Sequence, residues 1–400
     1  MSVSSAIQLP PLSLYIHVPW CVRKCPYCDF NSHQAPDENS EQNLPENEYI
    51  DALIKDLQTD LHWVQGRKIQ TIFIGGGTPS LFSVAAYKRL FAEIQTLVEF
   101  DDDIEITMEA NPGTFEAEKF AGYRQVGINR LSVGIQSFSD HQLEHLGRIH
   151  DGQQAKQAIL MAKDAGFDNF NIDLMHGLPD QSLQRALDDI SQAMELGPTH
   201  MSWYQLTIEP NTEYFKYPPK LPEDEILWDI QEAGQKLLAD HGYQQYEISA
   251  YAQAGKQARH NLNYWQFGDY LGIGAGAHGK VTDLTFTPEN LLASPVLRTW
   301  KTRLPKDYLN AAVQADKTFL AGKESILNED LGLEFLMNAL RLQQGFDTGL
   351  LSQRTGIAFN TLEKGLQAAQ QQGLLELQHD QLKTSQRGQF FLNEILELFL

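Results

Sequence analysis

Apolar residues follow two different spacings along the first half of the chain. Short apolar runs such as residues 12–18 suit buried strands, whereas segments such as residues 49–64 repeat apolar residues every three or four positions, as amphipathic helices do. The pattern predicts six strands, at residues 12–18, 71–74, 104–108, 130–135, 170–174 and 200–208. It also predicts intervening helices, at residues 49–64, 84–98, 116–125, 153–165 and 183–194.

These strands and helices alternate at intervals of roughly 30 residues, which indicates right-handed crossovers and a parallel sheet. The prediction is an α/β fold, an open partial (β/α)6 barrel of the TIM type over residues 1–250, because a closed barrel has eight such units. A doubly wound open sheet is the alternative. Both folds place ligands at the carboxyl ends of the strands, so the chemistry is expected there.

The second half of the chain has a different pattern. Residues 251–320 are predicted to be a connecting region, rich in glycine, in which residues 281–286 are expected to be extended. Residues 321–400 are predicted to form a smaller C-terminal α+β domain of the winged-helix type. Its expected elements are helices at residues 328–342, 348–354, 360–371 and 388–400, and a hairpin formed by residues 373–377 and 381–384.

Composition narrows the class of protein. The 400 residues suggest two or three domains, and contents of 42% hydrophobic and 21% charged residues are ordinary for a folded chain. No apolar run reaches the ~18 residues of a transmembrane segment, and the first eleven residues do not resemble a secretory signal. A cytoplasmic location is therefore expected, and peripheral membrane contact is compatible with it.

Charge argues against nucleic acid as a partner. The chain carries 31 Lys and Arg against 52 Asp and Glu, a formal net charge of −21, and a field of that sign repels phosphate backbones. Winged helices often bind DNA, but residues 341–400 hold five basic and six acidic residues and so lack the positive surface that DNA requires. The C-terminal domain is expected to pack or to contact protein instead.

All three cysteines of the chain lie within eight residues, at Cys21, Cys25 and Cys28. They follow the first predicted strand, on a loop that Pro19 and Pro26 keep irregular. An odd number of cysteines in a reducing compartment argues against disulfides. Three thiolates can hold a cubane iron–sulfur cluster, and because the chain has no fourth cysteine, one iron would stay open to a non-protein ligand.

Two alternatives to a cluster stay open at this point. His17 or His33 could complete a four-ligand zinc site, and the cysteines could also be buried structural residues. The acidic segment 37–47 after the cysteines is expected to be a mobile loop.

Polar and glycine residues gather where the predicted strands end. Glycines 75–77 could make a tight turn, or could offer exposed backbone N–H groups to a carboxylate ligand. Glu109 and Asp173 could cap helices, or could accept hydrogen bonds from ribose hydroxyls or an amine. Gln136 could form hydrogen bonds with backbone groups of the loop. Each residue alone has an ordinary explanation, but their joint position at one end of the sheet predicts a ligand site.

The C-x3-C-x2-C spacing resembles the cluster-binding signature of the radical S-adenosylmethionine (SAM) superfamily, with Tyr27 as the aromatic residue before the last cysteine. Further segments are similar, in order, to motifs of the oxygen-independent coproporphyrinogen III oxidase family. They lie at residues 15–19, 75–79, 109–112, 134–137, 146–148 and 171–174. The resemblance covers nearly the whole chain.

The resemblance implies a 4Fe–4S cluster on Cys21, Cys25 and Cys28, with the amino and carboxylate groups of SAM bound to the open iron. It also implies which residues line the SAM site. These are Tyr15, Tyr27, Gly76, Gly77, Thr78, Glu109, Gln136, Arg148 and Asp173. Arg148 alone would be an ordinary surface partner of a carboxylate, so its assignment depends on the resemblance.

Two features favour a heme-chaperone branch of that family over the oxidase itself. The oxidase carries a fourth cysteine two residues after the third, where this chain has Phe30. Residues 260–265 match the H-N-x-x-Y-W motif of the branch, which is associated with heme binding. The residues implied to contact heme are His260, Asn261, Tyr264 and Trp265. A buried histidine beside ordinary core aromatic residues is the alternative for this segment.

The branch implies a protein that binds heme and delivers it to respiratory hemoproteins. The alternatives are a coproporphyrinogen III dehydrogenase, another radical reaction, or a zinc-structured binding protein. Residues 272–279 superficially resemble a dinucleotide fingerprint, but no helix pattern follows them, so nicotinamide binding is not expected. The resemblance places this segment near the SAM site instead.

Overall fold

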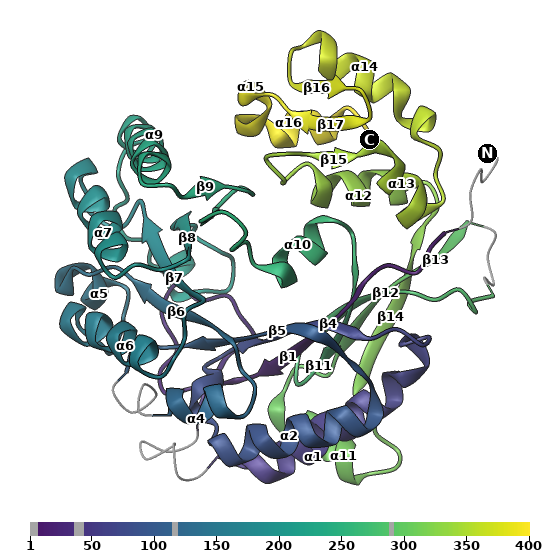
Figure 1. The fold of residues 1–400 in the computed structure, drawn as a ribbon, viewed down its shortest axis with the longest axis horizontal. Coiled ribbons are helices and arrows are strands. Elements are labelled where there is room, and N and C mark those ends of the chain that lie inside the picture. The colour runs from purple at the N-terminus through teal and green to yellow at the C-terminus, as the bar shows by residue number, and fades with distance from the viewer. Residues whose placement is uncertain (1–6, 36–43, 114–118, 288–291) are drawn as a thin grey trace.

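The computed structural model describes residues 7–35, 44–113, 119–287 and 292–400. Most of the acidic segment predicted to be a loop, and the first residues of the helix predicted at 116–125, lie outside these ranges. Figure 1 shows a strongly curved sheet with a layer of helices around its outer face and a small separate unit at the C-terminus.

Six parallel strands form the centre of the sheet, which confirms the predicted open α/β architecture. They are β1 (Leu12–Val18), β4 (Ile69–Gly76), β5 (Phe100–Ala110), β6 (Arg130–Gln136), β7 (Phe170–His176) and β8 (His200–Gln205), adjacent in that order. The sheet does not close, because further strands continue from both of its sides.

Strands from the predicted connecting region extend the sheet. Next to β1 lies β11 (Asp269–Ile273), also parallel, followed by the antiparallel strands β12 (His278–Thr282), β13 (Ala293–Lys301) and β14 (Leu320–Leu327). Beyond β8 lie β10 (Ala250–Ala252) and β9 (Gln244–Gln245), both antiparallel.

The prediction that residues 281–286 are all extended is wrong. The strand ends at Thr282, and Asp283 begins a turn. The Asp283 carboxylate accepts the N–H of Thr285 at 2.9 Å, and its carbonyl accepts the N–H of Phe286 at 3.1 Å. An aspartate that binds the backbone two residues ahead ends a strand in this way.

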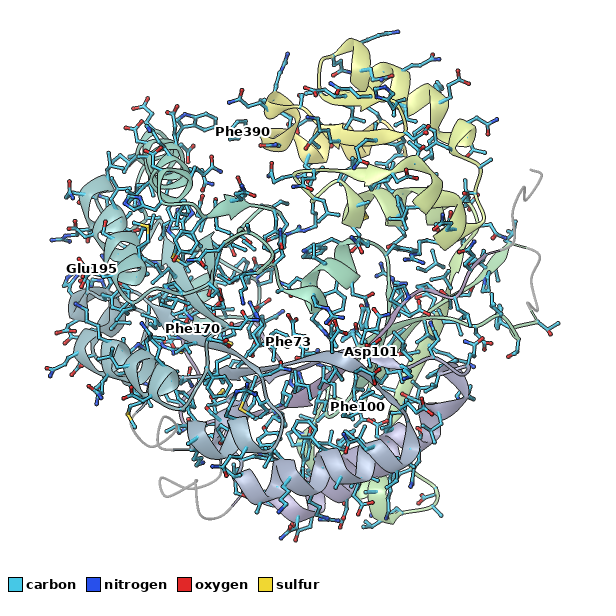
Figure 2. The ribbon with its side chains drawn as sticks, in the orientation of Figure 1. Phe73, Phe100, Asp101, Phe170, Glu195 and Phe390 are labelled. Carbon is cyan, nitrogen blue, oxygen red and sulfur yellow. The ribbon has the colours of Figure 1, made fainter. Side chains whose placement is uncertain are left out.

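Helices cover the outer face of the sheet, where alternate strand residues are apolar and buried. They are α1 (Glu46–Asp60), α2 (Val84–Leu97), α4 (Phe120–Gln125), α5 (Asp140–His145), α6 (Gly152–Asp164), α7 (Leu183–Glu195), α9 (Asp224–Asp240) and α11 (Pro305–Val313). Ser83, Asp151 and Ser182 each accept a backbone N–H at a helix start, as N-caps do. Figure 2 shows Glu195 at the outer edge of this layer and Phe73 near the barrel centre.

The inner face of the sheet differs from the outer face because its residues are largely polar. In β1, Leu14 and Ile16 point to the outer core, whereas Tyr15 and His17 alternate with them on the inner side. One short helix, α10 (Arg259–Trp265), lies on this concave side, as Figure 1 shows. The inner face is therefore where the fold can bind a polar or aromatic ligand.

The C-terminal unit has its own apolar core and a three-stranded sheet in the order β15–β17–β16. Its elements are α12 (Leu331–Ala339), β15 (Phe346–Asp347), α13 (Thr348–Thr355), α14 (Glu363–Gln371), β16 (Leu375–Gln378), β17 (Gln381–Thr384), α15 (Gln386–Phe390) and α16 (Leu392–Glu397). The predicted hairpin is thus confirmed. The single last helix predicted at 388–400 is wrong, because Phe391 leaves the helical conformation and separates α15 from α16.

No helix among the described residues is both long enough and apolar enough to cross a bilayer.

A buried ion cluster ties α1 to β13. The Lys301 ammonium, fully buried, lies 2.6 Å from a carboxylate oxygen of Asp56 and 2.7 Å from one of Asp60. The Tyr308 hydroxyl donates to the second oxygen of Asp56 at 2.7 Å. One lysine therefore faces two buried carboxylates, and burial raises the pKa of both.

Replacement of this lysine tests its structural role. Lys301→Met should lower the free energy of unfolding by about 3–5 kcal/mol, because two buried carboxylates lose their counter-charge. Lys236→Met is the matched control: Lys236 pairs with Asp240 at 2.6 Å, but its side chain is 74% exposed, so its loss should cost under about 1 kcal/mol. Urea denaturation measures both. Equal losses would contradict the analysis.

Candidate functional site: two adjoining cavities at the carboxyl ends of the strands

The three cysteines lie on the segment that follows β1, and all three are free and half-buried. The first part of this segment is more regular than predicted, because β2 (Trp20–Cys21) pairs in parallel with β3 (His33–Gln34). The N–H of Cys28 donates to the carbonyl of Cys25 at 3.1 Å, which forms a turn between the last two cysteines. The segment therefore has a defined backbone.

The arrangement of the thiols disfavours a zinc site. Among the described residues, no three His, Cys, Asp or Glu lie close enough together to hold a single metal ion. His17 is held elsewhere, since its Nδ1 lies 2.9 Å from the Tyr15 hydroxyl and its Nε2 lies 3.0 Å from the Asn31 carbonyl. The Nε2 of His33 lies 3.3 Å from the Asn31 amide oxygen. In a cubane each thiolate binds a different iron, and neither histidine is needed as a ligand.

The surroundings of the thiols contain features that oppose a thiolate and others that stabilise one. Burial raises the pKa of Cys21 to about 11, and the nearby thiols of Cys28 and Cys25 raise it further, whereas a hydrogen bond with Thr78 lowers it. The Arg148 guanidinium donates to the sulfur of Cys25 at 3.8 Å. A cationic metal cluster would offset the burial and keep all three sulfurs ionised.

The cysteines line a cavity of about 460 Å³ at the carboxyl ends of the strands, hereafter the cluster cavity. Eight of the nine residues predicted for SAM line it as well. They are Tyr27, Gly76, Gly77, Thr78, Glu109, Gln136, Arg148 and Asp173. The ninth, Tyr15, lines the neighbouring cavity. The parallel sheet thus brings together residues that lie up to about 150 positions apart in the sequence.

A chain of hydrogen bonds joins three strand ends in this cavity. The Asn111 amide donates to the Thr78 hydroxyl at 2.9 Å. Arg148 donates to the Asn111 amide oxygen at 2.8 Å and to the Gly134 carbonyl at 2.7 Å. The arginine is therefore a bracing residue rather than a surface partner, and its charge faces the cysteine segment.

Gln136 has a backbone conformation that the local sequence does not predict. Its φ of 71° is left-handed, and the register of β6 against β7 shifts between Gly134 and Gln136. The Tyr204 hydroxyl donates to its side-chain oxygen at 2.8 Å. A bulge of this kind turns a side chain into a site at a strand end.

Sequence reasoning missed several residues of the cluster cavity, namely Asn111, Ser132, Ser202 and Tyr204. A signal for them existed, because Ser132 and Ser202 face the barrel interior in their strands, at positions where the neighbouring residues are apolar and buried. Polar residues that alternate with apolar ones in a strand covered by helices mark the inner face.

Of the two alternatives for the glycine turn after β4, the structure favours the tight turn over exposed N–H groups. The N–H of Gly76 donates to Glu109 at 3.1 Å and that of Gly77 to the Val18 carbonyl at 2.7 Å. The N–H of Thr78 donates to the Trp20 carbonyl at 2.7 Å. The glycines are required for close approach, since a Cβ at Gly76 would lie 2.5 Å from the His17 ring.

Glu109 and Asp173 form an acidic pair on the inner face of the barrel. Burial and, to a smaller extent, the nearby Asp173 raise the pKa of Glu109 to about 7, and the hydrogen bond from Gly76 opposes the shift. Asp173 accepts hydrogen bonds from Asn171 at 2.7 Å and from Ser132 at 3.0 Å. Near neutral pH this site can therefore hold a proton on Glu109.

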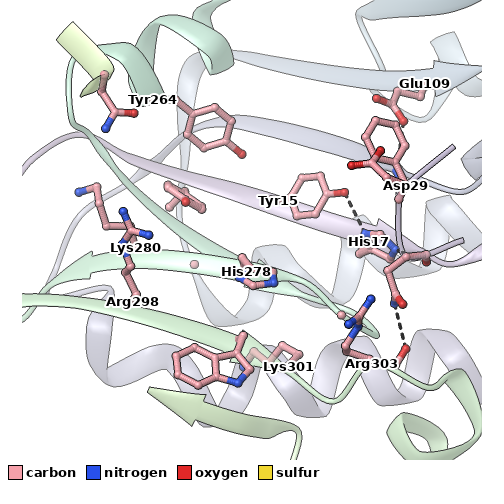
Figure 3. Close-up of a pocket in the computed structure, with 18 of the residues that line it drawn as sticks. Tyr15, His17, Asp29, Glu109, Tyr264, His278, Lys280, Arg298, Lys301 and Arg303 are labelled. Carbon is pink, nitrogen blue, oxygen red and sulfur yellow. Dashed lines mark hydrogen bonds between the residues drawn. The ribbon is translucent and has the colours of Figure 1, made fainter. Parts of the chain in front are cut away.

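A larger cavity of about 910 Å³, hereafter the aromatic cavity, adjoins the first. Asp29, Phe30, Gly76 and Glu109 line both cavities and so form their common wall. The aromatic cavity takes its name from its ring-bearing residues. These are Tyr15, Phe30, Tyr264, Trp265, Phe267, Tyr270 and Trp300. Figure 3 shows Tyr15, His278, Lys280, Arg298 and Arg303 around this space.

Of the four residues predicted to contact heme, Tyr264 and Trp265 line the aromatic cavity, but His260 and Asn261 line neither cavity. His260 is buried beneath Tyr264. Its Nδ1 lies 2.7 Å from the Thr71 hydroxyl and its Nε2 lies 2.8 Å from the Tyr264 hydroxyl. Burial lowers its pKa to about 3. The histidine of the motif therefore positions Tyr264, since both are one turn apart on α10.

The glycine-rich segment at 272–279, which the resemblance places near the SAM site, lies beside the neighbouring cavity. It forms the turn between β11 and β12, and Gly276, His278 and Gly279 line the aromatic cavity rather than the cluster cavity. A Cβ at Gly272 would lie 2.0 Å from the His278 carbonyl, so the two strands approach too closely for a side chain. No helix follows the segment, as expected.

Comparison with known proteins identifies the family. A model of the radical SAM superfamily matches residues 15–190, and a model of the HemN C-terminal domain matches residues 326–391. The heme chaperone HemW of Haemophilus influenzae is 51% identical over 397 residues, which is 98% of this chain and 99% of that protein. The chain belongs to the HemW family of radical SAM proteins.

Other members of the HemW family match over similar lengths. The Escherichia coli HemW is 49% identical over 98% of this chain and 99% of its own length, and the Bacillus subtilis HemW is 32% identical over 97% and 99%. The coproporphyrinogen III oxidase HemN of Escherichia coli has the same fold, with a TM-score of 0.80 at 22% identity over 99% of this chain and 91% of that one.

The acidic pair gives this HemW-family protein a specific pH dependence. Because Glu109 has an ordinary pKa of 4.5 and a folded pKa of about 7, the folded protein binds its proton more tightly than the unfolded chain does. The stability that this proton contributes is full below pH 4.5 and is lost as the pH rises through 7. Glu109→Gln should remove this loss, about 3 kcal/mol.

The measurement is the free energy of unfolding of cofactor-free protein at several pH values between 4 and 8. The difference between wild type and Glu109→Gln isolates the one carboxyl. Glu99→Gln, at a side chain 81% exposed, is the control and should leave the wild-type slope unchanged. Parallel curves for wild type and Glu109→Gln would refute the assignment.

Proposed function

We propose that the protein is a heme chaperone that holds a 4Fe–4S cluster and SAM in the cluster cavity and heme in the aromatic cavity. The observation that carries this proposal is the pairing of two unlike cavities across one wall. One is lined by the thiols and hydrogen-bonding groups, and the other by aromatic rings and cations. Membership of the HemW family supplies the identity of the cargo. Respiratory hemoproteins are the proposed acceptors, as the resemblance implies.

The cluster ligands would be Cys21, Cys25 and Cys28. Membership of the radical SAM superfamily implies the 4Fe–4S cluster and SAM, and the free, half-buried thiols on one cavity wall fit that group. When bound, the cluster would supply an electron and an open iron for the amino and carboxylate groups of SAM. The Arg148 guanidinium, which is always charged, would place a cation beside the sulfur of Cys25.

The chain's own polar groups would bind the rest of SAM. Asp173 faces the cavity and carries acceptor oxygens that suit hydroxyl or amine donors, and Gln136 is fixed by Tyr204. Glu109 lies in the common wall and keeps a proton near neutral pH. The glycine turn would supply close packing rather than N–H donors, because its donors are already bound to the protein.

The aromatic cavity suits a large, flat and partly anionic ligand. Its volume of about 910 Å³ lies near the top of the range of ligand sites, roughly 300–1,000 Å³. Tyr264 and Trp265 would cover a macrocycle face, and the buried Trp265 N–H has no partner among the described residues. His260 would act by holding Tyr264. Cations at the rim would attract propionate groups.

Substitution of the cysteines tests the cluster. Cys21→Ala, Cys25→Ala and Cys28→Ala should each reduce the iron and sulfide of anaerobically reconstituted protein from about four per chain to near zero, because a cubane needs three protein thiolates here. The Lys236→Met protein, prepared in parallel, should retain wild-type iron. Stoichiometric zinc in the wild type, with no sulfide, would contradict the assignment.

Two neighbouring substitutions in α10 test where heme lies. Trp265→Ala should weaken heme binding about tenfold, because an aromatic contact of roughly 0.5–1.5 kcal/mol is lost together with buried apolar area. Asn261→Ala is the comparison, since Asn261 belongs to the same motif but lines neither cavity, and it should bind as the wild type does. Fluorescence quenching on heme titration gives both affinities. A larger loss for Asn261→Ala would contradict the placement.

One preparation distinguishes the chaperone from a dehydrogenase. Anaerobic protein with its cluster and SAM is incubated with coproporphyrinogen III in one arm, and with heme followed by an apo-hemoprotein in the other. Heme transfer without protoporphyrinogen is expected, because Phe30 replaces the fourth cysteine of the oxidase. Formation of protoporphyrinogen would overturn the proposal in favour of the dehydrogenase, and failure to bind heme would overturn it outright.

A further inference from the structure

Two histidines line the aromatic cavity, His17 and His278, and they differ in how their rings are engaged. Both ring nitrogens of His17 are bound, one to the Tyr15 hydroxyl and one to the Asn31 carbonyl. The ring of His278 has no hydrogen-bond partner in the part of the chain that the structure describes, and its side chain is exposed to the cavity. Only His278 of the two can offer a nitrogen lone pair without breaking existing contacts.

The backbone of His278 is held firmly. It is the first residue of β12, opposite Trp300 in β13. The turn before it is closed by a hydrogen bond from the N–H of Ala277 to the Gly274 carbonyl at 3.0 Å. The close approach of Gly272 to the His278 carbonyl fixes the other side. Because the backbone of His278 is fixed and only its side chain can rotate, the imidazole is preorganised to bind a ligand.

The charge state of His278 suits metal ligation. Partial burial lowers its pKa, and the nearby guanidinium groups of Arg303 and Arg298 lower it further. The groups that face it are therefore two cations and the neutral rings of His17 and Trp300, and no carboxylate is among the causes of its shift. A neutral imidazole is the form that binds iron.

Competing ligands in the same cavity are less available. The hydroxyl of Tyr264 is bound to His260, and burial raises the pKa of Tyr270, which opposes a phenolate. The ammonium of Lys280 is paired with Asp269 at 3.1 Å. The cavity lining contains no cysteine and no methionine among the described residues. Of the two histidines in this lining, His278 is thus the one whose imidazole is free to bind iron.

A cation for a heme carboxylate lies beside it. Arg298 is already paired with Glu334, but the guanidinium of Arg303 has no ion pair within the described residues. Figure 3 places Arg303 on the same side of the cavity as His278. One free imidazole and one free guanidinium therefore line the same cavity.

We infer that His278 is the axial ligand of the heme iron and that Arg303 binds a propionate of the same heme. This inference rests on the proposed function and deepens it, since it names the residue that recognises the metal. It assigns ligation to the first residue of β12 rather than to the histidine of the H-N-x-x-Y-W motif.

The test is the spectroscopy of ferric heme bound to anaerobic, cluster-loaded protein. Electron paramagnetic resonance and resonance Raman spectra report the axial ligand without interference from cluster absorption. His278→Ala should abolish the histidine-ligated signature and weaken binding at least tenfold, and added imidazole should restore the signature. His241→Ala, at an exposed residue on the end of α9, is the matched control and should match the wild type.

Folding is checked on the same samples by cluster content and circular dichroism, and His278→Gln provides a second variant of similar size. An unchanged heme signature in both His278 variants would overturn the ligand assignment while leaving the chaperone proposal intact. A different result would assign ligation to the motif instead: His260→Gln loses the histidine-ligated heme signature at full cluster content, while His278→Ala keeps it. Absence of heme binding in the wild type would overturn both proposals.

The propionate contact has its own test. Arg303→Gln should weaken heme binding several-fold but keep the axial signature, because the iron ligand is untouched. Wild type should lose a similar factor when heme is replaced by its dimethyl ester, which lacks the carboxylates. The two changes should not add, since both remove the same contact. Additive losses would show that Arg303 does not meet the propionate.

Discussion

Two backbone hydrogen bonds between the glycine turn after β4 and the segment after β1 determine where the chemistry of this protein can occur. The N–H groups of Gly77 and Thr78 donate to the carbonyls of Val18 and Trp20, both at 2.7 Å. A Cβ at Gly77 would lie 2.5 Å from the Trp20 carbonyl oxygen, so no other residue allows this approach. Through these bonds the cysteine segment is joined to the mouth of the barrel, and the thiols meet residues contributed by the later strands.

The same barrel explains why a motif helix far along the sequence reaches this mouth. The inner face of the strands is polar and must be hydrogen-bonded where it is buried. The hydroxyls of Ser13 and Thr71 lie 2.7 Å apart, and Thr71 is in turn 2.7 Å from Nδ1 of His260. His260 then holds Tyr264. His260 thus provides a hydrogen-bond partner for the buried Thr71 hydroxyl. Because α10 is held there, the aromatic residues that follow His260 lie at the cavity wall.

The sequence predicts the parts of the structure that local periodicity encodes. The six parallel strands and their helices are readable because outward-facing positions such as Leu14 and Ile16 are apolar, and the C-terminal hairpin is readable from its turn. Long-range pairing is not encoded locally. Three features depend on contacts between residues far apart in the sequence: the pairing of β11 with β1, the hydrogen-bonded N–H groups of the glycine turn and the burial of His260. The family resemblance identified the H-N-x-x-Y-W motif but did not show how its side chains are arranged. The residues predicted for SAM come together because they lie at adjacent strand ends, whereas His260 lies behind the cavity wall and supports another side chain.

Charge distribution completes the physical account, because a chain with a net charge of −21 should repel a dianionic macrocycle. Screening limits that repulsion: at physiological ionic strength the Debye length is about 8 Å, so distant carboxylates contribute little. Lys280, Arg298 and Arg303 line the aromatic cavity, the first two paired with carboxylates, and of the two carboxylates in the common wall, Asp29 and Glu109, Glu109 can hold a proton near neutral pH. The protonation of Glu109 therefore matters for both cavities at once. It removes a negative charge from the wall that separates them, and it allows an acidic protein to present a locally cationic surface to an anionic ligand.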